Sequence, residues 1–110
     1  MGRNADTRMT QRQQWAAWLE EWHAALELGD RIVTLEFVSP KQIDGDADVI
    51  WMDRDAMRWK IRVRLGKHTD AEAVLIHELL HIRSGCMDPR DEAWLWVVAR
   101  LLVRLKYAPS

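Results

Sequence analysis

The chain has 110 residues, of which 16 are basic and 17 acidic, so its formal net charge is −1. This length predicts one compact domain over residues 1–110, and the balanced charge excludes the basic surface typical of proteins that bind nucleic acid or anionic membranes. No apolar run approaches the roughly 18 residues of a membrane span, and residues 1–7 lack the apolar stretch of a signal peptide. Because Cys86 is also the only cysteine, we expect a cytoplasmic protein without an internal disulfide.

Apolar residues at helical spacing predict a first helix that ends near Gly29. Core packing explains this stripe better than a partner-binding surface does, because aromatic side chains dominate small cores. Two apolar runs then predict strands over residues 31–38 and 48–52, with a connection over residues 39–46. The helical stripe consists of Trp15, Trp18, Leu19, Trp22, Ala25 and Leu26.

Residues 57–65 alternate between apolar and basic side chains, which predicts a third strand with one buried face. The ordinary explanation of the basic row is a solvated surface. If this strand lay at the edge of the sheet beside a cleft, it would suit the docking of an extended peptide, or its charges would prevent unwanted pairing. The basic residues are Arg58, Lys60, Arg62 and Arg64.

The next segment predicts a helix that carries the pattern H-E-x-x-H. Residues 69–72, Thr-Asp-Ala-Glu, match a capping box, and Gly85 offers a C-terminal stop. Four helical residues turn the chain by roughly 40° past a full turn, so His77 and His81 leave the same face and can bind one ion. Glu78 lies beside them, where a carboxylate can act as a general base. The alternative is a pair of core histidines with other partners, but a largely apolar helix favours zinc.

A catalytic zinc usually has three protein ligands, and the candidates for the third lie just downstream. Asp88 is a plausible N-cap before Pro89, which places Glu92 about one turn into the next helix. We favour Glu92 as the third ligand, with Asp91 next, although both could instead complement the helix dipole. Cys86 ranks low, because a lone cysteine in such a turn is usually a small buried residue.

The last predicted helix, from about residue 89 to residue 106, is apolar on most sides. It is therefore either central to the fold or in contact with another chain, and a homodimer would cover it. Tyr107 follows this helix, and His68 precedes the motif helix; we expect both to be packing residues. We expect His23 to be a partly exposed histidine of the first helix.

An H-E-x-x-H helix, a tight turn and a glutamate-bearing helix resemble the gluzincins, above all the single-domain minigluzincins and related metallopeptidase-like domains of phages and bacteria. The resemblance covers the chain from the second strand to the last helix and rests mainly on the motif. It implies zinc ligands at His77, His81 and Glu92 and a general base at Glu78. Metzincins and the similar rRNA-maturation endonucleases depart from this chain, because their third histidine would fall at residue 87, a methionine.

We therefore expect an α+β, zincin-like domain with an N-terminal helix, a sheet of about three strands, the zinc helix and the glutamate helix. The expected function is zinc-dependent hydrolysis of a peptide or protein substrate. One alternative is a latent or non-catalytic zinc module, in which Cys86, Asp91 or the C-terminal tail closes the metal site. Another is a protease that cleaves regulators, of the kind found beside phage and mobile-element repressors.

Overall fold

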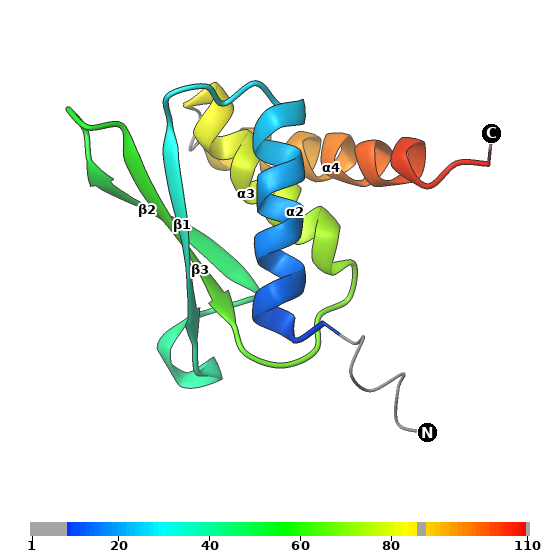
Figure 1. Ribbon diagram of the computed structural model, residues 1–110, viewed down its shortest axis with the longest axis horizontal. Coiled ribbons are helices and arrows are strands. Elements are labelled where there is room, and N and C mark those ends of the chain that lie inside the picture. The colour runs from blue at the N-terminus through cyan, green and yellow to red at the C-terminus, as the bar shows by residue number, and fades with distance from the viewer. Residues whose placement is uncertain (1–8, 86–87, 110) are drawn as a thin grey trace.

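The computed structural model describes residues 9–85 and 88–109. Within them the chain forms three α-helices and a small mixed sheet, so the predicted α+β class is confirmed (Figure 1). The sheet lies to one side of α2 and α3, and α4 extends away from it. No helix among the described residues is both long enough and apolar enough to cross a membrane. In chain order the elements are α2 (Gln11–Ala25), β1 (Ile32–Val38), a 3-10 turn (Pro40–Gln42), β2 (Ala47–Asp53), β3 (Arg58–Arg64), α3 (Ala71–Ser84), a second 3-10 turn (Pro89–Asp91) and α4 (Glu92–Lys106).

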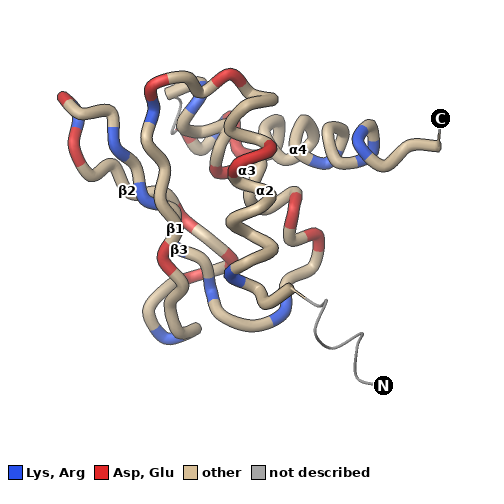
Figure 2. The backbone as a smooth tube through the Cα atoms, viewed as in Figure 1, with Lys and Arg blue, Asp and Glu red and all other residues tan. Residues whose placement is uncertain are grey.

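The three strands are arranged in the order β1-β3-β2, with β1 parallel and β2 antiparallel to β3. The basic strand β3 is therefore central, and its interpretation as an edge strand for peptide docking is wrong, since both of its sides are paired. Three of its four basic residues instead form ion pairs on the exposed face, and Figure 2 shows acidic and basic residues interspersed along the strands. The pairs are Lys60 with Glu36, Arg62 with Asp48, and Arg64 with Asp46.

The core is built around α3, which contacts α2, α4 and β2. The inner face of β3 contributes Ile61 and Val63, and α2 contributes Trp15 and Trp22, so the predicted packing role of the tryptophan stripe is confirmed. Almost every side of α3 is covered because it lies between other elements, which explains why its sequence shows little amphipathic pattern. Its buried apolar residues are Ala73, Val74, Leu75, Ile76, Leu79 and Ile82.

The start of α3 differs from the predicted capping box. Asp70 is the N-cap, has φ 55° and makes no side-chain capping bond. Glu72 is instead 6% exposed and accepts hydrogen bonds from three side chains far away in the sequence. Trp22 Nε1 and Lys106 Nζ each lie 2.6 Å from its Oε2, and the Tyr107 hydroxyl donates to Oε1. Glu72 therefore joins the ends of α2 and α4 to the first turn of α3.

One face of α4 carries an apolar stripe that no described element covers. Its members are Trp94, Val97, Leu101 and Leu105, each of them exposed. They recur every three or four residues and so share one side of the helix. A homodimer would bury this stripe, and it stays a prediction.

The ionised form of Glu72 should contribute to stability in a pH-dependent way. Burial alone would raise the pKa of Glu72, but the bonds from Lys106, Tyr107 and Trp22 outweigh it and lower the pKa below 4.5. The contribution is therefore complete above about pH 4.5 and is lost as the pH falls through the lower folded-state pKa. We expect Glu72→Gln to lower the free energy of unfolding by about 1–3 kcal/mol at neutral pH in urea denaturation, with a smaller difference near pH 3.

Thr69→Ala is the control for this experiment. Thr69 is exposed, and the structure gives it no capping role, so its loss should change stability little. If Thr69→Ala cost about 1 kcal/mol and Glu72→Gln cost nothing, the capping box would be right and the buried network wrong.

Candidate metal centre

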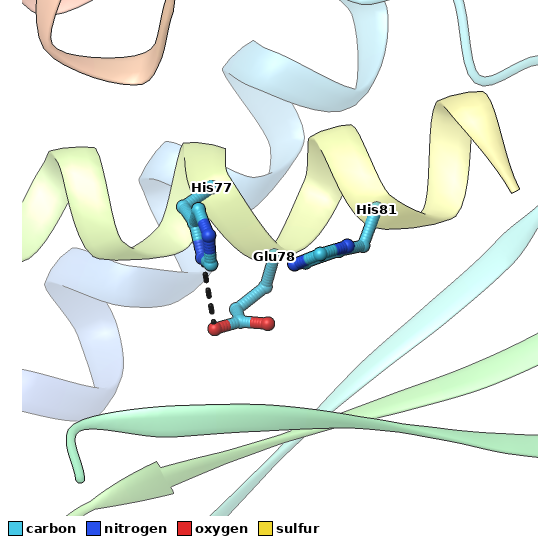
Figure 3. A group of neighbouring side chains, drawn as sticks. All are labelled: His77, Glu78 and His81. Carbon is cyan, nitrogen blue, oxygen red and sulfur yellow. Dashed lines mark hydrogen bonds and ion pairs between the residues drawn. The ribbon is translucent and has the colours of Figure 1, made fainter. Parts of the chain in front are cut away.

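Three buried polar side chains lie on one side of α3. Figure 3 shows His77, Glu78 and His81 projecting from this helix toward the strands of the sheet. The rings of His77 and His81 meet edge to face, with their centroids 4.7 Å apart. The helical spacing therefore places both imidazoles at one point, as the motif predicts.

Glu92 brings a carboxylate to these histidines from the first turn of α4. Its Oε2 lies 2.9 Å from Nε2 of His77 and 2.8 Å from Nε2 of His81. One carboxylate oxygen and two ring nitrogens, all potential metal ligands, thus lie within hydrogen-bonding distance. The Glu92 side chain is 46% exposed, so this corner of the site is open to solvent.

The turn that directly precedes Glu92 is tighter than the sequence suggests. We expected Glu92 about one turn into a helix from Pro89, but residues Pro89–Asp91 form a 3-10 turn and α4 begins at Glu92. Asp88 does act as a cap, because its side chain accepts from the backbone N–H of Arg90. Asp91, the other candidate ligand, is the N-cap of α4. Cys86 and Met87 lie outside the described residues.

Glu78 lies within the same cluster, and its Oε2 is 3.3 Å from Nδ1 of His77. Burial raises the pKa of Glu78 above 4.5, and the attraction of His77 and His81 only partly offsets this. For His77 the balance is the reverse: burial lowers its pKa, but the hydrogen bond and charge of Glu78, together with Glu92, outweigh burial and raise the pKa above 6.5. The cluster of two carboxylates and two imidazoles therefore favours a bound cation, either a proton or a metal.

Trp96 holds the His77 ring from the side of α4. The two rings are stacked, with centroids 4.2 Å apart and planes 11° apart. The guanidinium of Arg100 lies 5.2 Å from the centre of the Trp96 ring, on the next turn. In the sequence, Trp96 is only one of many apolar residues of this helix. Its position four residues after Glu92 places both on one face of α4, and this spacing was the available signal.

A hollow beside the cluster leads toward the sheet. Its volume is about 280 Å³, and it lies between the edge strand β2 and the start of α4. Glu78, His81 and Glu92 form its polar wall, so a substrate in this space would meet the carboxylates and an imidazole directly. Its remaining lining residues are Ala47, Asp48, Val49 and Pro89.

Other side chains that the sequence raised lie elsewhere. His68 bonds Asp46 and the carbonyl of Arg64, and half-buried His23 bonds the carbonyl of Arg31. Tyr107 bonds Glu72 at the far end of α4. All three residues therefore bond other parts of the fold, and His23 is partly exposed, as predicted.

The donors of the cluster fit zinc chemically. Potential ligand atoms of His77, Glu78 and His81 lie within 4.8 Å of one another. Zinc accepts imidazole nitrogen and carboxylate oxygen at about 2.0–2.2 Å, which separates tetrahedral donors by roughly 3.3 Å. The distances from Glu92 to the two histidines are a few tenths of an ångström shorter, so small side-chain shifts would admit an ion.

No family model, no curated protein and no solved structure matches this chain. The resemblance to gluzincins therefore stays a prediction that rests on the motif and on the position of Glu92.

The stack between Trp96 and His77 should influence metal affinity. We expect Trp96→Leu to weaken zinc binding about tenfold or more, because the ring that orients His77 is lost while an apolar side chain remains. Competition with a chromogenic chelator measures the affinity. Trp94→Leu is the matched control, since Trp94 lies on the same helix and is 65% exposed. Equal affinity in the two variants would show that the stack does not position the ligand.

Proposed function

We propose that the chain binds one zinc ion through His77, His81 and Glu92 and hydrolyses peptide bonds, with Glu78 as the general base. The observation that carries this proposal is the single Glu92 oxygen at 2.9 and 2.8 Å from the two Nε2 atoms. Three donors from two helices converge there, and Glu78 and an open hollow lie beside them. This combination supplies what a hydrolytic zinc site needs: three ligands, a base and space for a substrate.

The zinc ion, Glu78 and Trp96 have different roles in the proposed reaction. When bound, zinc would act as a Lewis acid toward the scissile carbonyl and lower the pKa of a water molecule. Glu78 then takes the proton of the attacking water and returns it to the amine that leaves. Its raised pKa suits this exchange, because a base is most effective when its pKa approaches the working pH. Trp96 keeps the His77 ring oriented through its stack.

The edge strand β2 supports a peptide as the substrate. It pairs with β3 on one side only, and its residues Ala47–Val49 line the hollow beside Glu78. An extended peptide can add to such an edge through backbone hydrogen bonds, which are independent of side-chain sequence. The strand that docks the peptide is then β2, in place of the basic strand of the sequence-based interpretation.

A non-catalytic zinc module is the second candidate. The observation that favours it is the proximity of Glu78 to the two histidines, since potential ligand atoms of all three residues lie within 4.8 Å of one another. If Glu78 were itself a ligand, two histidines and two glutamates would fill a tetrahedral site and leave no position for water. A regulator-cleaving protease differs from the first candidate only in its substrate.

Replacement of the two glutamates distinguishes these candidates. We expect Glu78→Gln to retain about one zinc per chain and to lose activity at least about a hundredfold, because the amide cannot accept the proton. Glu92→Gln should lose most of the bound metal, because one of its three ligands becomes a weak neutral donor. Elemental analysis of both variants and of the wild type, with turnover of a quenched fluorescent peptide library, measures both effects.

The opposite pattern would contradict the peptidase. If Glu78→Gln released the zinc, Glu78 would be a ligand and the closed module would be correct. If the wild type bound no zinc after reconstitution, both candidates would fail, and the histidines would be core residues satisfied by carboxylates.

A further inference from the structure

A second, apolar hollow adjoins the proposed catalytic cleft. Its volume is about 120 Å³, and it lies between the hairpin of β2 and β3 and the C-terminal end of α3. No Asp, Glu, Lys or Arg occurs among the described residues that line it, and His81 is its only titratable side chain. The lining residues are Val49, Trp51, Trp59, His81, Ile82 and Gly85.

Two tryptophans form the floor of this hollow. Trp51 and Trp59 are directly opposite in the antiparallel pair of β2 and β3, and their rings are stacked with centroids 5.6 Å apart and planes 12° apart. Trp51 is 51% exposed, and the Arg54 guanidinium lies 4.6 Å from the centre of its ring. The stack holds a large apolar surface in place before any ligand arrives.

The C-terminal end of α3 covers the aromatic pair only in part: Trp59 packs against the core, whereas Trp51 is exposed. Trp59 shares a face of β3 with Ile61 and Val63, which are fully buried. Gly85 ends α3 with φ 69°, so the inner face of the sheet continues past the helix. The apolar surface at Trp51 and Trp59 therefore belongs to the core-facing side of the sheet, and His81, Ile82 and Gly85 lie across the hollow from it.

The apolar hollow is continuous with the catalytic one. Val49 and His81 line both of them. Side chains on one face of a strand recur every two residues, about 6.6 Å apart, so Val49 and Trp51 are successive positions along β2. A peptide paired with β2 beside the cluster would place a side chain two residues farther along over the aromatic pair. A cavity of about 150 Å³ holds a benzene ring, and this hollow is somewhat smaller at about 120 Å³, so it suits a large aliphatic side chain or part of one aromatic ring.

We infer that this hollow is a specificity subsite for a bulky apolar side chain of the peptide, with Trp51 and Trp59 as its recognition residues. The inference rests on the proposed function only for the nature of the ligand, an extended peptide at β2. A charged side chain is disfavoured inside the hollow, because none of its lining residues is Asp, Glu, Lys or Arg, although Arg54 lies over the Trp51 ring at its border.

Binding of blocked tetrapeptides tests the subsite without any turnover. The probes differ at one position, which is phenylalanine, alanine or aspartate, and the proteins are metal-free wild type and zinc-treated Glu78→Gln. Dissociation constants come from the shifts of the tryptophan indole N–H signals in NMR titrations. We expect the phenylalanine peptide to bind at least about tenfold tighter than the alanine peptide, with shifts at Trp51 and Trp59 and not at Trp94.

A matched pair of variants on β2 completes the test. Trp51→Thr should abolish the preference for phenylalanine, because it removes the exposed ring but keeps a residue that suits a strand. Met52→Thr is the control, since Met52 is the next residue, is 53% exposed and points to the opposite face of the sheet, and it should retain the preference. Equal binding of the phenylalanine and alanine peptides to the wild type, or an unchanged preference in Trp51→Thr, would overturn the subsite.

The peptide-binding test can fail or succeed independently of the proposed peptidase activity. If the chain binds no zinc but still selects phenylalanine through Trp51, the subsite stands and the peptidase does not. If the zinc form cleaves peptides without an apolar preference, the peptidase stands and the subsite is wrong.

Discussion

The contact between Glu92 and the two histidines of α3 determines how the last helix is attached to the rest of the molecule. Glu92 begins α4, and its carboxylate lies within hydrogen-bonding distance of His77 and His81. At the other end of α4, Lys106 bonds the buried Glu72 at the start of α3. The two helices are thus joined by polar contacts at both ends, with apolar packing between them. Because buried polar groups that lose a partner are costly, both contacts constrain the position of α4 strongly.

This attachment also shapes the electrostatics of the candidate site. Glu78 and Glu92 place two carboxylates beside two imidazoles; Glu78 and both imidazoles are buried, whereas Glu92 is partly exposed. Such a group is stable only with bound positive charge, so protons and metal ions compete for the same nitrogen atoms. In the metal-free protein, the neighbouring carboxylates raise the pKa of His77, so the ring binds a proton more readily. The residues that support the fold and those that would bind zinc are therefore the same.

The small sheet contributes through its strand order. Because β3 is central, its ion pairs stay on the exposed face, and β2 becomes the edge beside the cluster. The length of α3 then decides how much of the inner face is covered: Ile61 and Val63 are fully buried, whereas Trp51, beside the end of the helix, is exposed. The edge strand β2 and the C-terminal half of α3 line both the proposed catalytic hollow and the apolar hollow.

The sequence by itself determined the features that depend on local periodicity. Within the residues that the structure describes, it predicted the three helices and the three strands, the shared face of His77 and His81, and the approach of Glu92, because two helices joined by a short turn must pack against each other. Only the tertiary structure decided the strand order and the partners of distant residues. Alternation shows which face of a strand is buried but not which strand lies beside it. Glu72 was misread because a capping box is a local pattern, whereas its actual partners, Trp22 and Lys106, lie 50 and 34 residues away and meet it only through the packing of three helices.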